Sequence, residues 1–462
     1  MSELPRGWTY VPIGDLCNLI NGRAFKPQEW SDSGLPIIRI QNLNNPKAKF
    51  NYYSGSLENK HHIKSGDLLF AWSGTPGTSF GAHIWNRGNA ALNQHIFKIE
   101  FPDLSVDRDF LRYAINQKLD ELIGSAQGGV GLRHVTKGTF EKTEIAFPPF
   151  AEQTRIAAKL DELLAQVATL KVRIDGIPAL LKRFRQSVLA TAVSGRLTED
   201  WRRAQMTLEE TENSILVKSL ELPVDWQKTL LSSVISDLRY GTAQKCDYGI
   251  GSIGVLRIPN IGEYGINLTD LKSSNFSKSE IEKLSLQAGD IILIRSNGSV
   301  ELVGKSAVVT QNEEGLLFAG YLIRVRLDRE KVIPEYVNFW FRSPAVRQLI
   351  ELTARSTSGV NNINSEEIRS LVFTRPSLEE QTEIVRRIEQ LFAFADQLEA
   401  RVKAAQARID RLTQSILAKA FRGELVPQDP NDEPASVLLE RIKAQRAAAP
   451  KARRGRQAAK LS

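Results

Sequence analysis

The sequence contains the stretch EQTRIAAKLDELLAQVATLKVRIDGIPALLKRFRQSVLATAV, residues 152–193, in which apolar residues recur at alternating steps of four and three. This spacing is typical of two helices that bury a shared seam in a coiled coil. A second stretch with the same pattern starts at Glu380, 228 residues later, with Ala395 and Ala405 at two of its ten positions. The other predicted seam positions are Ile156, Leu160, Leu163, Val167, Leu170, Ile174, Ile177, Leu181, Phe184, Val188, Ile384, Ile388, Leu391, Leu398, Val402, Ile409, Leu412 and Ile416.

The repeat extends beyond the two helical stretches. Leu4-Pro5…Trp8 recurs as Leu222-Pro223…Trp226, and Gly129-Val130 recurs as Gly359-Val360. The offset drifts from 218 to 230 residues before it settles at 228, so loops of different length separate shared elements. Two copies of a domain followed by a long helix predict a pseudo-twofold repeat with antiparallel helices, each burying its seam on the other.

The parts between the helical stretches mix strand and helix signals and predict an α+β fold. A long amphipathic helix is expected at 107–123 and another at 334–352. Polar loops rich in Gly, Ser and Asn separate the elements. The expected strands are 36–40, 67–72, 95–101 and 143–147 in the first copy, and 254–258, 290–295, 303–309 and 321–327 in the second.

The long helices have recognisable ends and one interruption. Ser377 and Glu380 form a capping-box pattern, and Gly195 and Gly423 stand where a glycine commonly ends a helix. About 42 residues at ~1.5 Å each give a rod of roughly 60 Å. Pro178 lies inside the first helix and removes one of its backbone hydrogen bonds, so this helix is expected to be kinked or divided into two segments.

These patterns define five regions. Two mixed α/β domains are expected to be separated by a long antiparallel two-helix coiled coil. The predicted regions are a first domain at 1–150, a first spacer helix at 151–200, a linker and second domain at 201–376, a second spacer helix at 377–423, and a C-terminal segment at 424–462 with a short helix and a basic, disordered tail.

Composition restricts the class of protein. The net charge is +8, but residues 441–462 hold eight Lys and Arg and no acid, so the body has 53 basic residues against 53 acidic ones. Any affinity of the body for DNA must therefore come from local clustering. No apolar run is long enough to span a membrane and the start lacks a signal-peptide pattern, so a cytoplasmic protein is expected. The only cysteines, Cys17 and Cys246, exclude a cysteine zinc cluster.

Taken together, the motifs resemble the specificity subunit of Type I restriction–modification enzymes. The resemblance covers nearly the whole chain. It rests on five segments: FPPFAEQTRI at 147–156, RPSLEEQTEI at 375–384, and residues 186–202, 414–425 and 433–442.

The resemblance implies two target-recognition domains that each read one half of an asymmetric bipartite site in double-stranded DNA. It also implies partners: two adenine-N6 methyltransferase subunits and, in the full complex, restriction and translocase subunits. S-adenosylmethionine, ATP and Mg²⁺ are expected only in those partners. No cofactor, metal or catalytic centre is expected in this chain.

An enzyme with its own centre is the first alternative, and three motifs speak against it. Phe147-Pro148-Pro149-Phe150 lacks the side-chain acceptor that opens the base-gripping loop of amino-methyltransferases. The glycines at 249–254 precede a predicted strand rather than a helix, unlike a dinucleotide-binding motif. Gly298 and Gly304 enclose five residues where a phosphate-binding loop requires four. The five histidines, all in the first half, show no metal-ligand spacing.

The second alternative is a scaffold that binds no DNA. The DNA-reading hypothesis needs polar or basic side chains on loops that reach base edges. For any single candidate, a solvated loop side chain or a turn former is the better reading. The candidates are Arg23, Lys26, Asn42, Ser73, Thr75, Arg133 and His134 in the first domain, and Tyr240, Lys245, Asn260, Arg295, Ser296, Asn297, Asn361 and Asn362 in the second.

Overall fold

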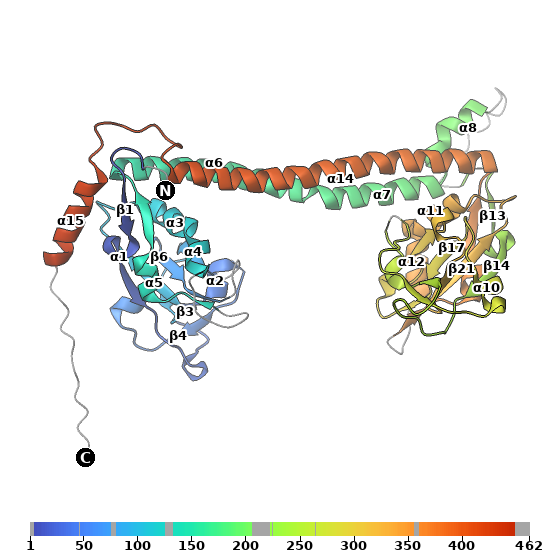
Figure 1. Cartoon of the computed structure of the whole chain (residues 1–462), viewed down its shortest axis with the longest axis horizontal. Helices are drawn as coiled ribbons and strands as arrows, with labels where there is room; N and C mark the ends of the chain where they lie inside the picture. The colour runs from blue at the N-terminus through green and yellow to red at the C-terminus, as the bar shows by residue number, and fades with distance from the viewer. Residues whose placement is uncertain are drawn as a thin grey trace, which may run out of the picture. The chain divides into compact units, whose positions relative to one another are not determined.

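A computed structural model describes residues 4–45, 47–74, 80–124, 133–205, 222–223, 225–263, 265–354 and 360–448. The chain divides into two compact units (Figure 1). Unit 1 comprises residues 1–173 and 405–462, and unit 2 comprises residues 174–404. Each unit contains one α+β domain with segments of two long helices, so the predicted fold class is confirmed.

Unit 1 is built on two four-stranded sheets, with strand orders β2-β10-β6-β8 and β4-β3-β9-β5. Two short ladders, β1-β12 and β11-β7, complete the domain. Its strands are β1 (Thr9–Pro12), β2 (Asn18–Asn21), β3 (Leu35–Ile38), β4 (Asn51–Tyr53), β5 (His62–Ile63), β6 (Leu68–Ala71), β7 (Ser73–Gly74), β8 (Gly81–Ile84), β9 (Ala90–Leu92), β10 (Ile96–Glu100), β11 (Arg133–His134) and β12 (Glu144–Phe147). Its helices are α1 (Ile13–Leu16), α2 (Ile40–Asn44), α3 (Arg108–Gln117), α4 (Leu119–Gly124), α5 (Lys137–Lys142), α6 (Phe150–Asp175) and α15 (Ala435–Ala448).

Unit 2 repeats this topology. Its sheet β14-β21-β17-β19 corresponds to β2-β10-β6-β8, and its ladders β13-β23 and β18-β22 correspond to β1-β12 and β7-β11. Its strands are β13 (Gln227–Leu230), β14 (Ile235–Tyr240), β15 (Ile253–Leu256), β16 (Lys272–Ser274), β17 (Ile291–Ile294), β18 (Ser296–Asn297), β19 (Ser306–Val308), β20 (Leu317–Phe318), β21 (Leu322–Leu327), β22 (Asn361–Asn362) and β23 (Val372–Arg375). Its helices are α7 (Ile177–Val193), α8 (Glu199–Gln205), α10 (Lys278–Leu284), α11 (Pro334–Arg342), α12 (Pro344–Thr353) and α13 (Ser365–Arg369).

All eight strands expected from the sequence are present, each within a few residues of its predicted bounds. The two expected domain helices are both divided, into α3 and α4 and into α11 and α12. The second division has a clear cause, because Ser343 precedes Pro344 and a residue before proline is disfavoured in helical conformation. The sequence pattern does not predict the two-residue strands such as β5 and β7, nor the longer β14.

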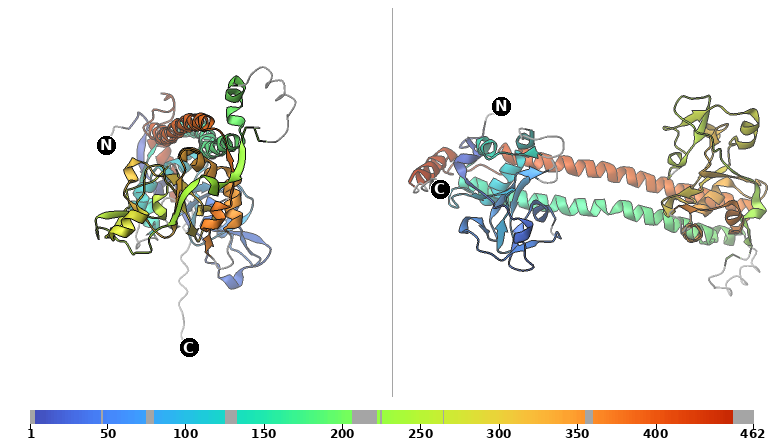
Figure 2. Two further views of the ribbon diagram at one scale, coloured as in Figure 1. Left: turned by 90° about the vertical axis from the view of Figure 1, so that its right-hand side faces the viewer. Right: turned by 90° about the horizontal axis from the view of Figure 1, so that it is seen from below.

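The long helix α14 (Leu378–Phe421) contributes residues to both units, and it pairs with a different helix in each. In unit 1, Nζ of Lys171 on α6 lies 2.7 Å from a carboxylate oxygen of Asp410. In unit 2, Arg185 on α7 donates to Asp396 and Glu399 at 2.5 and 2.9 Å, while Arg387 donates to the Leu197 carbonyl. Residue numbers thus fall along α14 as they rise along α7, which confirms an antiparallel pair (Figure 2).

The helix α6–α7 is interrupted where the sequence predicted. Asp175 ends α6, Ile177 begins α7, and Pro178 occupies the first turn of α7. Proline is tolerated there because the first helical N–H groups have no partner within the helix. The two-segment helix is therefore confirmed.

Most predicted seam residues lose solvent contact. Those that are buried are Ile156, Leu160, Val167, Leu181, Val188, Ile384, Ile388, Ala395, Val402, Ile409 and Ile416. The prediction is wrong at Leu170 and Leu412, which are each 47% exposed. These two residues belong to the part of unit 1 where Lys171 pairs with Asp410. Two helices without a third element beside them cannot enclose every leucine of a seam.

Each long helix is tied to its domain by a Glu-Gln pair at its start. Gln153 accepts from the Asp107 amide at 2.8 Å and donates to the Pro148 carbonyl at 3.0 Å. In unit 2, Gln381 accepts from the Ile333 amide and donates to the Pro376 carbonyl at the same two distances. The preceding glutamates accept from tryptophan in both units.

The capping box at Ser377 is only half formed. The Ser377 hydroxyl accepts from the Glu380 amide at 3.2 Å, as predicted. The Glu380 carboxylate does not return to the Ser377 amide, because it accepts from Trp226, Thr198 and Arg202 instead. This side chain therefore anchors the helix to its domain rather than capping it.

Gly195 and Gly423 end the long helices in left-handed conformation, as expected, with φ of 76° and 72°. A Cβ atom at Gly423 would overlap the ring of Pro5. We expect Gly423→Ala to lower the free energy of unfolding by about 1–3 kcal/mol through backbone strain and this clash. Gly138→Ala is the matched control, since Gly138 lies in α5 with open space around it, and should cost nothing. Equal effects of the two variants in urea unfolding would contradict this role of Gly423.

Candidate nucleic-acid interface

Eight of the fifteen predicted DNA-contact residues meet at one short ribbon in each domain. In unit 1, Trp72 follows β6 and donates its amide to the His95 carbonyl at 3.3 Å, while its own carbonyl accepts from Val135 at 2.9 Å. In unit 2, Arg295 follows β17 and makes the same two bonds, to Tyr321 at 2.8 Å and from Ile363 at 3.0 Å. We call each arrangement a ribbon site: β7, β11, Trp72 and His95 in unit 1, and β18, β22, Arg295 and Tyr321 in unit 2.

In unit 1 the ribbon site gathers aromatic and imidazole rings. The Trp72 ring centroid lies 5.5 Å from that of His95 and 5.8 Å from that of His134. Gln94 and His95 are joined by a hydrogen bond of 3.2 Å between their side chains. Burial and the neighbouring His134 lower the pKa of His95, so its ring is neutral at physiological pH.

In unit 2 the same positions carry a guanidinium, a phenol and amides. The Arg295 guanidinium lies over the Tyr240 ring, with its carbon 4.4 Å from the ring centroid. Tyr321 is 64% exposed. Asn361 donates to the Gly298 carbonyl at 3.0 Å and so closes the turn after β18. The side chains of Arg295, Asn361 and Asn362 are half-buried.

Polar atoms without an internal partner recur at equivalent positions of the two sites. Among the described residues, the Trp72 indole nitrogen and the His134 Nδ1 atom are buried without a hydrogen bond. So are the Arg295 Nε atom and the Asn362 Oδ1 atom, at the corresponding positions of unit 2. Such atoms cost about 1–3 kcal/mol each unless a ligand supplies the bond. The two sites therefore share a backbone frame and an unmet bonding capacity, but differ in side-chain chemistry.

The structure assigns Asn42 and Asn260 another role. Both are buried, and each amide closes a loop of its own domain. Asn42 donates to the carbonyls of Ala48 and Lys49, and Asn260 donates to those of Asn267 and Asp270. Their side chains are thus committed to the fold, and neither belongs to a ribbon site.

Other candidates lie outside the ribbon sites or outside the described residues. Arg23 is paired with Glu29 and stacks on Phe25 and Tyr53. The side chains of Lys26 and Lys245 are exposed. Thr75 and the side chain of Arg133 lie outside the described part of the chain. The candidates that meet at the ribbon sites are Ser73, His134, Tyr240, Arg295, Ser296, Asn297, Asn361 and Asn362.

Sequence reasoning missed Trp72, His95 and Tyr321. A signal was present: Trp72 and Arg295 each directly follow the central strand of the repeated Gly-Asp motif at 66–67 and 289–290. Aligning the two copies through that strand would have placed Trp72 opposite Arg295. The pattern of apolar strands alone gives no reason to select an aromatic residue at a strand end.

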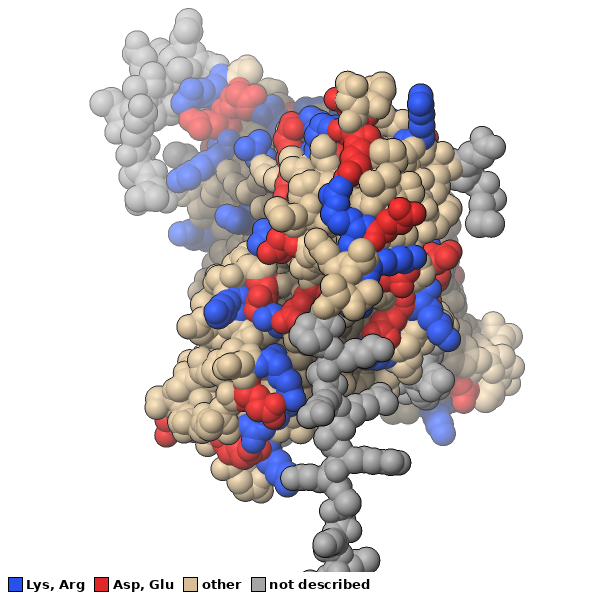
Figure 3. All heavy atoms as spheres, turned by 90° about the vertical axis from the view of Figure 1, so that its left-hand side faces the viewer, with Lys and Arg blue, Asp and Glu red and all other residues tan. Residues whose placement is uncertain are grey.

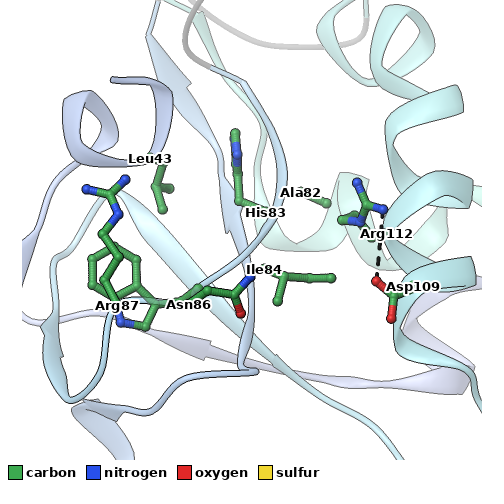
Figure 4. A pocket seen from close by; sticks show the side chains of 9 residues that line it. Leu43, Ala82, His83, Ile84, Asn86, Arg87, Asp109 and Arg112 are labelled. Carbon is green, nitrogen blue, oxygen red and sulfur yellow. Dashed lines mark ion pairs between the residues drawn. The ribbon is translucent and has the colours of Figure 1, made fainter. Parts of the chain in front are cut away.

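A polar pocket of unit 1 is lined by β8, α3 and the turn after β8 (Figure 4). Its volume is about 390 Å³. Its two arginines have partners within the protein, because Arg112 lies 3.2 Å from Asp161 and Arg87 donates to the Asn42 carbonyl at 2.5 Å. Burial lowers the pKa of His83 at its wall. Both arginines of the lining are thus already engaged within the protein, and the pocket is a weak candidate for binding a charged ligand.

Other kinds of site find no support in the described residues. They contain no group of three or more His, Cys, Asp and Glu side chains that could hold a metal ion. No helix among them is long and apolar enough to cross a membrane. On the face drawn in Figure 3, basic and acidic side chains are interspersed rather than gathered into a field of one sign.

The fold is that of a protein with two copies of one α+β domain, and comparison with known proteins identifies its class. The family described as "Type I restriction modification DNA specificity domain" matches residues 5–179 and 223–405. The chain belongs to this family. The two matched segments correspond to the two copies of the repeat.

Individual relatives extend the match over nearly the full length. The chain is 35% identical to the Type I restriction enzyme EcoKI specificity subunit of Escherichia coli K12, over 96% of this chain and 97% of that one. It is 32% identical to the StySPI specificity subunit of Salmonella potsdam, over 96% of both chains. The fold is similar to that of the HsdS subunit from Thermoanaerobacter tengcongensis, with a TM-score of 0.57 and 18% identity over 92% of this chain and 98% of that one.

Proposed function

We propose that this chain reads an asymmetric, bipartite site in double-stranded DNA, with one ribbon site for each half. The observation that carries the proposal is the shared backbone frame with unlike side chains. A common frame presents each set of side chains from the same edge of the domain. Different side chains at that edge predict that the two half-sites differ in sequence.

The chain directs chemistry that its partners perform. Two adenine-N6 methyltransferase subunits bind to it, and restriction and translocase subunits join in the full complex in the cytoplasm. These partners hold S-adenosylmethionine, ATP and Mg²⁺. The chain itself supplies no catalytic centre, cofactor or metal.

The methyltransferases dock on the long helices, where apolar side chains remain exposed. Val172 in unit 1 is 74% exposed, and Leu180 and Phe394 in unit 2 are 57% and 55% exposed. Leu170 and Leu412 in unit 1 are also partly exposed. Large apolar side chains exposed on a polar helix are candidates for a surface that another protein covers.

Reconstitution tests the proposal. A candidate methyltransferase subunit from the same organism is mixed with genomic DNA and S-adenosylmethionine, with and without the purified chain. We expect sequence-specific adenine methylation only when both proteins are present, and no turnover by the chain alone. Turnover by the chain alone would favour an enzyme. If the assembled complex does not shift DNA in a gel-mobility assay, a scaffold that binds no DNA would be favoured.

A further inference from the structure

Arg295 combines a fixed position with unused hydrogen-bond donors. Its guanidinium rests on the Tyr240 ring, and the Tyr240 hydroxyl accepts from the Ser365 amide at 2.9 Å. That hydroxyl also donates to the Ser365 side chain at 3.2 Å. The ring is therefore held from the start of α13 and in turn holds the plane of the guanidinium.

The donors of Arg295 are poorly matched inside the protein. The one hydrogen bond of its guanidinium to a described residue runs from Nη1 to the Gly320 carbonyl and is 3.5 Å long. The Nε atom is buried without a partner, and no carboxylate of a described residue lies within ion-pair distance. Arg324 in the neighbouring sheet also has a buried Nε atom without a partner, but the guanidinium groups of Arg324 and Arg326 are paired with Asp237 and Asp290.

A guanidinium held in one plane with free donors suits an acceptor pair that lies in the same plane. In the DNA major groove, the O6 and N7 atoms of guanine form such a pair, and arginine binds them with two parallel bonds. We propose that Arg295 is the specificity-determining residue of unit 2, that it reads a guanine in the half-site of this unit, and that Tyr240 is its positioning residue. This inference rests on the proposed function.

The same argument separates the two units. In unit 1, Trp72 occupies the position that Arg295 has in unit 2. An indole has a single N–H donor and cannot form the two parallel hydrogen bonds of a guanidinium. The guanine contact made through this backbone position is therefore a property of unit 2 alone. The half-site read by unit 1 therefore serves as an internal control in the test of Arg295.

The test measures binding of the complex of this chain with its methyltransferase to duplexes that carry the methylated motif. Each base pair of the motif is changed in turn, for the wild-type chain and for Arg295→Gln, Arg295→Lys and Tyr240→Leu. We expect the wild-type complex to prefer G·C over A·T at one position of one half by about 5- to 150-fold. Arg295→Gln should reduce that preference to less than about threefold and leave the other half unchanged.

The remaining variants separate reading from folding and from charge. Arg295→Lys keeps the charge but loses the fork, so binding should persist with reduced selectivity at the same position. Tyr240→Leu should lower the selectivity while the arginine is still present. Arg329→Gln is the matched control, because Arg329 is exposed beyond the far end of β21, about 20 Å along the strand. It should leave every base preference unchanged.

Three results would overturn the inference. One is that Arg295→Gln changes no base preference, which would show that Arg295 contacts no guanine. Another is an equal loss of affinity for all duplexes, with the slope of log K against log salt concentration reduced by about one. This result would identify a phosphate contact. The third is relaxed preference in both halves. If the wild-type complex itself shows no sequence preference, the proposed function fails, and that outcome is distinct from the other three.

Discussion

Removing one heptad from each long helix is expected to shorten the gap between the two recognised half-sites by about three base pairs, or to abolish specific binding. Lys171 and Asp410 pair in unit 1, so residues 167–173 lie opposite residues 408–414 and are removed together. Two turns of helix amount to ~10 Å, which is about three base pairs of B-DNA. If the altered spacing cannot be met by any duplex, affinity should fall to the non-specific level, a loss of at least ~10³-fold.

Insertion of seven residues at the same two points is the matched control. It should lengthen the recognised gap by about three base pairs. Deletion from α6 alone should disrupt the pairing with α14 and lower the stability instead. The gap is measured by selecting bound duplexes from a pool with gaps of different lengths. An unchanged gap in both paired variants would show that the helices do not set the spacing.

Replacing Glu380 by alanine is expected to destabilise unit 2 by about 3–5 kcal/mol, since it removes the acceptor of two buried donors and one partly buried cation. The Glu380 side chain is 4% exposed and bridges three elements. It accepts from Trp226 at 2.9 Å and from Thr198 at 2.7 Å, and it pairs with Arg202. Hydrogen exchange read separately in each unit should show faster opening in unit 2 and little change in unit 1.

Glu152, the equivalent residue of unit 1, should respond in the opposite way. It accepts only from Trp8, at 2.9 Å, and its second oxygen is buried without a partner among the described residues. Burial raises the pKa of Glu152, so its contribution to stability is present at acid pH and is lost as the pH rises through the folded-state pKa. Glu152→Gln should therefore be neutral or stabilising at pH 7, whereas Glu380→Gln should be destabilising. Similar losses from the two glutamines would contradict this distinction.

The repeat and the seam could be predicted because they depend on local periodicity. Positions such as Ile156 and Ile384 are buried in equivalent places, and the glycines that end the helices adopt the expected conformation. The exposed pair Leu170 and Leu412 could not be predicted, because burial there depends on how much surface a two-helix pair can cover. Periodicity gives the direction in which a side chain points, and packing decides whether anything covers it.

The candidate site was only partly accessible from the sequence. Loop position and side-chain type identified Arg295 and His134, which the structure brings to equivalent ribbons. The same criteria selected Asn42 and Asn260, which are buried and serve the loops that contain them. A polar residue that closes a loop and one that faces a ligand have the same appearance in a sequence. Only their hydrogen-bond partners distinguish them.

Mapping of methylated adenines in cells with and without this gene tests the central claim most directly. If two unlike domains of one chain read DNA together, a single motif should lose its methylation on deletion. That motif should consist of two unlike halves separated by unspecified bases. Loss of no motif, or of a continuous or palindromic one, would contradict the assignment of one half-site to each unit.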